Sequence, residues 1–159
     1  RDRSVEKEKI INMVKAARLA PSASNGQPWR FFAVEDKEKL KAVAGSLGTI
    51  NSWAKTAPII IIGCSTSSNV AHYIADVLKG VKYYLIDLGI AMEHMVLAAT
   101  EMGLSTCWIG WFAERKIKKI LDIPSSWKIV SVLTVGYAHE DLKTIEKKTL
   151  SIEEILFFK

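Results

Sequence analysis

Two arginines and a serine stand together at the start of the chain, where they could bind a phosphate. The run Arg1-Asp2-Arg3-Ser4 places two guanidinium groups and one hydroxyl within four residues. Guanidinium forks match the oxygens of a phosphate monoester, and the serine adds a hydrogen-bond donor. A solvated, charged chain end is the competing interpretation. It applies equally to the basic pair Lys147-Lys148, which could otherwise add charge to the same phosphate.

A loop of small and polar residues follows the first expected helix. Its sequence from residue 20 to residue 31 is A-P-S-A-S-N-G-Q-P-W-R-F. Small residues allow a backbone to approach a flat ring closely, while Ser22, Asn25 and Gln27 supply hydrogen-bond donors and acceptors. Pro21 and Pro28 restrict the backbone at the two ends of the loop. An ordinary helix-to-strand connection has a similar composition, so the loop alone does not establish a binding site.

A third segment, residues 106–112, reads T-C-W-I-G-W-F and is expected to end a strand at a glycine between aromatic residues. Backbone N–H groups at such a strand end can face a heterocycle that accepts and releases hydride. The alternative is a core strand whose tryptophans serve only in packing.

Several common catalytic and nucleotide-binding motifs are absent from the sequence. It contains no G-x-G-x-x-G, no P-loop and no G-x-S-x-G elbow. The three histidines, His72, His94 and His139, lack metal-ligand spacing, and there is no C-x-x-C pair. We expect His94 to be a hydrogen-bonded helix histidine. Cys64 and Cys107 lie in apolar stretches, which predicts buried, reduced thiols in a cytoplasmic protein.

Hydrophobic periodicity predicts the elements that must position these segments. Helices are expected over residues 5–19, 37–44, 70–78, 83–102 and 113–121, and strands over residues 29–34, 57–63, 105–109 and 127–135. Asp36 is the expected N-cap of the second helix. Helices that interleave with four strands indicate an α+β or α/β domain with one sheet.

Two segments are more apolar than a surface element should be. The helix over residues 83–102 is apolar almost all round, so both its faces must be covered by this chain or by another copy. The end of the tail, residues 152–158, also needs a place to bury its apolar side chains.

Composition limits the class of protein. The 159 residues are 49% hydrophobic and 25% charged, which is typical of one soluble globular domain over residues 1–159. No apolar run reaches the ~18–20 residues of a membrane span. The net charge of +5 favours an anionic partner: a phosphate-bearing cofactor, an acidic substrate or nucleic acid. Nucleic-acid binding is disfavoured because the basic helix near residues 115–119 lacks interleaved aromatic residues.

The order of these segments resembles the nitroreductase family of FMN-dependent oxidoreductases. The motifs that carry the resemblance are R-x-R-S, the A-P-S-A-S-N-G-Q-P-W-R-F loop, A-P-I-I-I-I, A-A-T-E-M-G-L-S-T-C-W-I-G and L-D-I-P-S-S-W-K-I-V-S-V-L-T-V-G-Y. The resemblance covers nearly the whole chain. It implies an α+β fold with a central, mainly antiparallel sheet flanked by helices. It also implies a homodimer with FMN at its interface, where the long buried helix lies.

The resemblance implies a role for each candidate residue by position. Arg1, Arg3 and Ser4 would hold the phosphate end of FMN, with Lys147 or Lys148 adding charge. The loop residues that would line the isoalloxazine of the partner subunit are Pro21, Ser22, Ala23 and Asn25.

The remaining roles concern the polar part of the flavin. Gln27 would either bind this part or brace the loop, and Asn51 would lie at the pyrimidine edge. Ile109 and Gly110 would direct backbone N–H groups toward flavin N5 and O4. No side chain is expected to be catalytic, because flavin N5 is the reacting centre.

The activity implied is ping-pong transfer of hydride from NADH or NADPH, through flavin N5, to a small acceptor such as a nitroaromatic or a quinone. The alternatives are another FMN-dependent redox reaction, for example dehalogenation or flavin breakdown, and a flavin-free binding or regulatory dimer. The motifs specify neither the physiological acceptor nor the preferred nicotinamide.

One departure from the family pattern lies near the start. Family members carry roughly ten more residues between the positions of Ser4 and Val5, so we expect that these two residues are not covalently joined. The insertion that covers the substrate in the family is also small or absent here, which predicts an open pocket.

Overall fold

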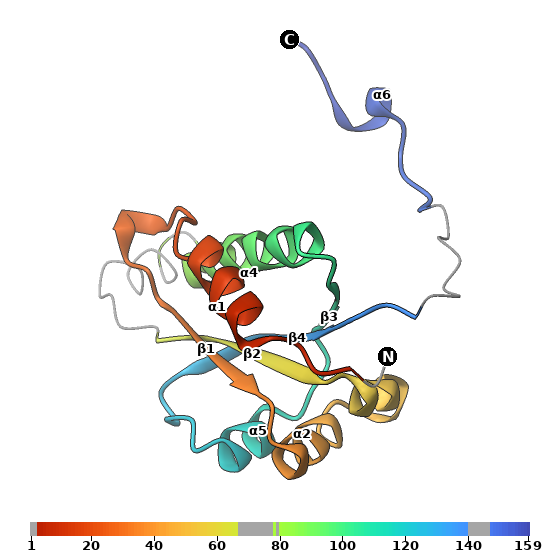
Figure 1. The fold of residues 1–159 in the computed structure, drawn as a ribbon. Coiled ribbons are helices and arrows are strands. Elements are labelled where there is room, and N and C mark those ends of the chain that lie inside the picture. Colours follow the sequence, from red (N-terminus) through yellow and green to blue (C-terminus); the bar gives the residue numbers. More distant parts are fainter. Residues whose placement is uncertain (1–2, 67–77, 79, 140–146) are drawn as a thin grey trace.

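A four-stranded sheet forms the centre of the computed structural model, which describes residues 3–66, 78, 80–139 and 147–159. The strands are β1 (Trp29–Val34), β2 (Ile59–Ser65), β3 (Ser105–Ile109) and β4 (Lys128–Gly136). Their order is β1-β2-β4-β3, and every neighbouring pair is antiparallel (Figure 1). The predicted α+β fold with an antiparallel sheet is therefore confirmed.

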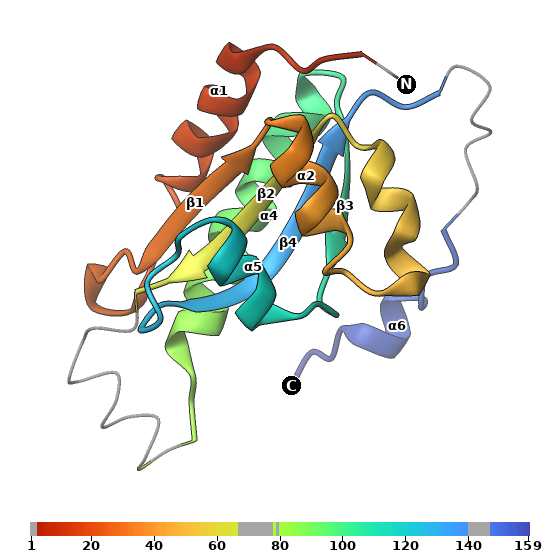
Figure 2. The same ribbon diagram turned by 90° about the horizontal axis from the view of Figure 1, so that it is seen from below.

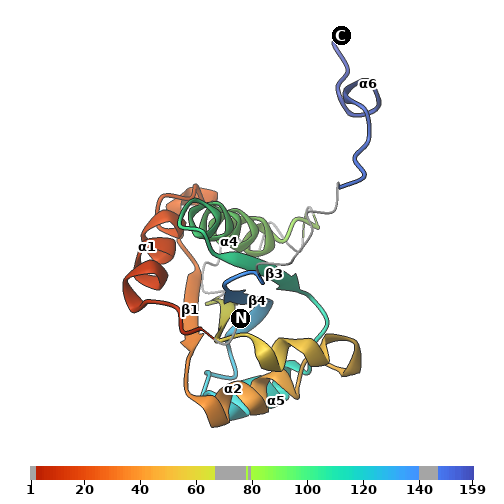
Figure 3. The same ribbon diagram turned by 45° about the vertical axis from the view of Figure 1, so that its right-hand side comes forward.

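Two pairs of helices sandwich the sheet. Helices α1 (Lys7–Ala17) and α4 (Tyr83–Glu101) cover one face, and α2 (Lys37–Ala44) and α5 (Glu114–Ile120) cover the other (Figures 1 and 3). Figure 2 shows α2 and α5 lying across their face of the strands. Because side chains alternate along a strand, Ile59 and Ile61 enter the core below α1 and α4, whereas Ile60 and Ile62 enter the opposite core.

Helix α4 packs closely on the sheet through Gly63 of β2. A Cβ atom at Gly63 would lie 2.4 Å from the sulfur of Met92 and 3.2 Å from Leu88 Cδ2. The opposite side of α4 exposes Leu85, Ile86 and Leu97. The described part of the chain thus covers only one face of this apolar helix.

Local signals located most elements to within two residues. Helix α2 begins after Asp36, whose side chain accepts a hydrogen bond of 2.9 Å from the Lys39 N–H, and it ends at Gly45. Helix α4 and the strands lie where periodicity predicts them. Two 3₁₀ segments, η1 (Ala23–Asn25) and η2 (Thr49–Thr56), and the short helix α6 (Ile152–Ile155) were not predicted. The helix expected over residues 70–78 lies outside the described residues, apart from Leu78.

The two cysteines differ in their surroundings. Cys64 is buried on β2, as predicted, but the prediction of burial for Cys107 is wrong, because its thiol is exposed. The physical reason is topological: Cys107 lies on β3, an edge strand. Neither cysteine forms a disulfide. His94 Nδ1 lies 3.2 Å from the Ala16 carbonyl oxygen, which confirms a hydrogen-bonded helix histidine.

No helix in the described ranges has the length and apolarity that crossing a membrane would require.

Candidate functional site

The loop before β1 has an unusual backbone and exposes most of its residues. Ser24, Asn25 and Gln27 adopt positive φ angles of 51°, 53° and 43°. Non-glycine residues rarely adopt this left-handed region, and such residues concentrate at binding sites. The N–H of Gln27 donates to Ser22 Oγ at 3.0 Å, and Gln27 Nε2 donates to Asn25 Oδ1 at 3.1 Å. Gln27 is thus bonded to two other residues of the loop, and its role toward a cofactor stays a prediction.

Arg3 is held at the other end of the sheet by groups that the sequence did not single out. Its Nη2 donates to Glu6 Oε1 at 3.0 Å, and its guanidinium carbon lies 3.9 Å from the centroid of the Tyr137 ring. Lys9 Nζ donates to the Tyr137 hydroxyl at 3.0 Å and to the Met102 carbonyl at 2.7 Å. The Tyr137 hydroxyl in turn donates to Glu6 Oε2.

These contacts favour the charged form of Glu6. The hydrogen bond from Tyr137 is the largest cause, followed by a backbone N–H and by Arg3, and together they lower the pKa of Glu6 from 4.5 to about 2. The carboxylate thus stays ionised at any ordinary pH. No sequence motif indicated Glu6, Lys9 or Tyr137. Glu6 and Lys9 lie close to Arg3 in the sequence, but Tyr137, which joins all three, comes from a distant segment.

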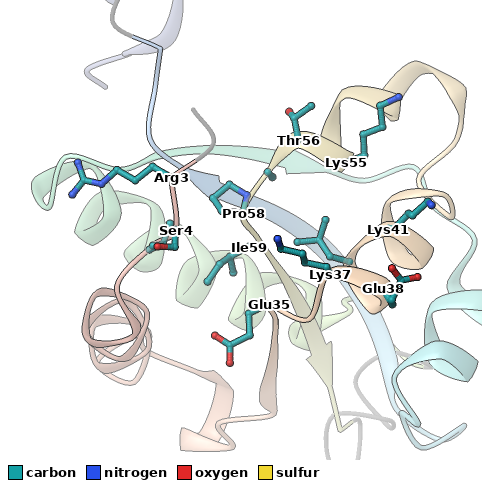
Figure 4. A pocket seen from close by; sticks show the side chains of 13 residues that line it. Arg3, Ser4, Glu35, Lys37, Glu38, Lys41, Lys55, Thr56, Pro58 and Ile59 are labelled. Atoms are coloured by element: carbon teal, nitrogen blue, oxygen red, sulfur yellow. The ribbon is translucent and has the colours of Figure 1, made fainter.

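A cleft of about 990 Å³ opens beside Arg3 and Ser4 (Figure 4). Val5, Leu40, Pro58 and Ile59 contribute its apolar lining. Figure 4 shows Arg3 and Ser4 at one end of the cleft and Lys41 and Lys55 at the other. The charged residues that line it are Arg3, Lys37, Lys41, Lys55, Glu35 and Glu38. The excess of positive charge suits an anionic ligand. The absence of a peptide bond between Ser4 and Val5 stays a prediction.

A second cleft, of about 190 Å³, lies between η2 and the edge strand β3. Its lining includes Trp53, Cys107 and Tyr137, and it shares Thr56, Ala57 and Pro58 with the larger cleft. Tyr137 therefore faces this cleft while its ring contacts Arg3.

Asn51, Ile109 and Gly110 lie on the elements that border this region. Asn51 is half-buried in η2, and its Nδ2 donates to the Leu47 carbonyl at 2.9 Å. This bond directs the amide, and no donor among the described residues bonds to Oδ1. Ile109 ends β3 and is buried, whereas Gly110 is exposed with open space where a side chain would be. A flat ligand could therefore approach the backbone at Gly110 without a steric clash.

The strand register places the loop and Arg3 at opposite ends of the sheet. The loop leads directly into Trp29, which pairs with Ser65. Tyr137, whose ring contacts Arg3, follows Gly136, and Gly136 pairs with Ser105. Strand β1 runs from Trp29, beside the loop, to Val34, which pairs with Ile60 at the end of the sheet near Tyr137. The full length of the strand, roughly 20 Å, therefore separates the loop from Arg3. One chain therefore does not bring the two halves of the predicted site together.

Two predicted residues lie apart from both halves. Lys147 and Lys148 are exposed on the C-terminal tail, which extends away from the sheet and its helices (Figures 1 and 3). Arg1 lies outside the described residues. No group of three or more histidine, cysteine or acidic residues within the described ranges could hold a metal ion.

Comparison with known proteins gives concordant matches. A model described as "Nitroreductase family" matches residues 1–51 and 46–137. An Archaeoglobus fulgidus protein named "Putative NADH dehydrogenase/NAD(P)H nitroreductase" is 31% identical over 144 residues, covering 88% of this chain and 78% of the relative. "FMN reductase [NAD(P)H]" of Bacillus subtilis is 26% identical over 148 residues, covering 86% of this chain and 59% of the relative.

A solved structure gives a close match to the fold. The FMN-dependent nitroreductase of Clostridium difficile R20291 superposes with a TM-score of 0.80 at 28% identity, covering 99% of this chain and 90% of the other.

Proposed function

Because the chain belongs to the nitroreductase family, we propose that it is an FMN-dependent NAD(P)H oxidoreductase. When bound, FMN would supply the redox chemistry: hydride from NADH or NADPH at flavin N5, then two electrons to a small acceptor such as a nitroaromatic or a quinone, in a ping-pong cycle. The protein would be a single cytoplasmic domain that works as a homodimer, and its two free cysteines suit a reducing compartment.

The observation that carries this proposal is the separation of two half-sites on one chain. Arg3 and the loop of residues 22–27 occupy opposite ends of the sheet, although both have the chemistry of flavin ligands. A second copy resolves this separation if its loop lies against the Arg3 half of the first chain. Leu85, Ile86 and Leu97 give α4 an exposed apolar face of the kind that pairs subunits.

The residues present fit the chemistry of FMN. Arg3 and Ser4 would bind the phosphate, with Arg1 adding charge. Asn51 Oδ1 is free to accept from the pyrimidine edge of the ring. The exposed backbone at Gly110, beside Ile109, allows N–H groups to approach N5 and O4.

The loop would supply the opposite wall of the site. Pro21, Ser22, Ala23 and Asn25 are small or polar, and they would line the isoalloxazine of the partner subunit. Gln27 would keep Asn25 in place through its hydrogen bond. The chain's own contribution is to orient the ring, to exclude water from one side and to hold positive charge near the phosphate.

A visible absorption spectrum of the purified protein tests the proposal. Flavin bands that bleach on anaerobic addition of NADH or NADPH are the expected result. Flavin bands that persist would show that neither NADH nor NADPH reduces the flavin, and would favour another FMN-dependent reaction. A protein that stays colourless after incubation with FMN would overturn the proposal in favour of a flavin-free dimer. The oligomeric state, measured by light scattering during gel filtration, is expected to be a dimer.

A further inference from the structure

A buried carboxylate in α4 contacts the loop of residues 22–27. Asp87 is only 3% exposed, and its Oδ1 accepts a hydrogen bond of 3.0 Å from the N–H of Ala23. The second oxygen, Oδ2, is also buried and has no hydrogen-bond partner among the described residues. Burying an anion with a single neutral donor is unfavourable, so an aspartate here requires an explanation other than stability.

The loop that Asp87 contacts cannot hold its conformation by propensity. Ser24, Asn25 and Gln27 all adopt left-handed backbone angles without being glycine. Strain of this kind persists only where the surroundings maintain it. The bonds from Gln27 to Ser22 and to Asn25 join the loop to itself, but they do not attach it to a helix.

The bond between Ala23 and Asp87 supplies that attachment. Ala23 is the first residue of the 3₁₀ turn η1, directly before the left-handed residues. A charged acceptor makes this bond stronger than an amide or a hydroxyl would. Helix α4 is rigidly packed on the sheet through Leu88, Ala91 and Met92, which are fully buried. The carboxylate is thus carried by a helix whose neighbouring side chains are fixed in the core.

We propose that Asp87 is a positioning residue that fixes the flavin-binding loop through the Ala23 N–H. This inference rests on the proposed function, because the loop's role is to line the flavin. Asp87 acts through Ala23 and does not itself touch the ring. Oδ2, which has no hydrogen-bond partner among the described residues, makes this aspartate unfavourable for stability, as expected of a residue whose role is to hold the loop.

The test compares Asp87→Ala and Asp87→Asn with the wild type and with Lys119→Ala, an exposed control on α5 across the sheet. Amide hydrogen exchange of Ala23 is measured without FMN, and FMN affinity is measured by quenching of flavin fluorescence. In Asp87→Ala we expect Ala23 exchange to accelerate, and FMN affinity to fall, by about tenfold or more, the value of a hydrogen bond to a charged group. Asp87→Asn keeps an acceptor, so its losses should be smaller.

A urea titration distinguishes positioning from stability. Because Asp87→Asn removes a poorly compensated buried charge, its urea midpoint should equal or exceed that of the wild type although it binds FMN more weakly. The inference would be overturned if both variants kept the wild-type rate of Ala23 exchange and the wild-type FMN affinity. If Asp87→Ala does not fold, the same comparison is made with Asp87→Asn alone. A wild type that fails to bind FMN refutes the proposed function, while Ala23 exchange still tests the positioning role.

Discussion

The guanidinium carbon of Arg3 lies 3.9 Å from the centroid of the Tyr137 ring. The hydroxyl of the same ring bonds to Lys9 and Glu6, and Glu6 also bonds to Arg3. One tyrosine at the end of β4 therefore organises the charges of the N-terminal segment. Since a cation within about 6 Å of a ring centroid is attracted to the ring face, Arg3 is held in place before any phosphate arrives.

Replacing Tyr137 should weaken FMN binding in two distinguishable steps. Tyr137→Phe keeps the ring under Arg3 but removes the hydrogen bonds to Lys9 and Glu6, so we expect FMN affinity to fall about threefold, the lower end of the net value of one hydrogen bond. Tyr137→Leu also removes the cation–π contact, worth about 0.5–1 kcal/mol at an exposed site, and should lose a further two- to fivefold. Fluorescence titration with FMN measures both. Equal affinities for all three proteins would show that Tyr137 does not position Arg3.

The low pKa of Glu6 predicts a pH dependence of stability. The folded-state pKa is lowered from 4.5 to about 2, so the contribution of this carboxylate is complete above pH 4.5 and is lost as the pH falls toward 2. Urea midpoints of the wild type and of Glu6→Gln should therefore differ most above pH 4.5 and converge toward pH 2. Glu8→Gln, in the first turn of α1, is the matched control. A difference that stays constant from pH 6 to pH 2 would contradict this assignment.

Local sequence signals were sufficient for most elements of the fold. Strand β1 and helix α2 lie where their aromatic residues and the Asp36 cap predicted them. The 3₁₀ segment η2 has neither a sustained period nor a side-chain cap, so no pattern indicated it. Cys107 was misplaced because an edge strand is defined by sheet order, which depends on pairing between distant segments.

The candidate site was only partly accessible from the sequence for the same reason. The loop of residues 22–27 and the run containing Arg3 each have recognisable local chemistry. By contrast, the contacts of Tyr137 with Arg3 and Glu6, and of Asp87 with Ala23, join residues far apart in the sequence, and no spacing in the chain reveals such contacts. Their positions follow from the register of the strands and from the packing of α4.

Close packing at Gly63 predicts a large effect from one added methyl group. Gly63→Ala would place a Cβ atom 2.4 Å from Met92 Sδ, so the helix or the side chain must move. We expect a loss of about 1–3 kcal/mol in the free energy of unfolding, measured by urea denaturation. In a Met92→Ala background the same change should cost less, because the obstructing sulfur is gone. Equal losses in both backgrounds would locate the strain elsewhere.

The two thiols should react very differently. Burial raises the pKa of Cys64 to about 12, whereas Cys107 is exposed on the edge strand. Iodoacetamide at pH 8 should therefore label Cys107 alone in the native protein and both cysteines in urea. Mass spectrometry of tryptic peptides identifies the labelled residue, and Cys107→Ser should abolish native labelling. Modification of Cys64 before Cys107 in the native protein would contradict the burial of Cys64 on β2.

A charge introduced on the exposed face of α4 should both dissociate the proposed dimer and weaken FMN binding. Ile86, Ile90 and Leu97 follow the helical spacing of one stripe, and Leu97 is 61% exposed in the single chain. In the proposed dimer, Leu97→Glu would bury an unpaired carboxylate, which is strongly unfavourable. We expect a monomer in gel filtration and an FMN affinity at least about tenfold weaker. The matched control is Lys119→Glu on α5, which lies across the sheet and should leave both properties unchanged. A monomer with wild-type FMN affinity would mean that one chain completes the site, and a dimer with wild-type affinity would move the interface away from α4.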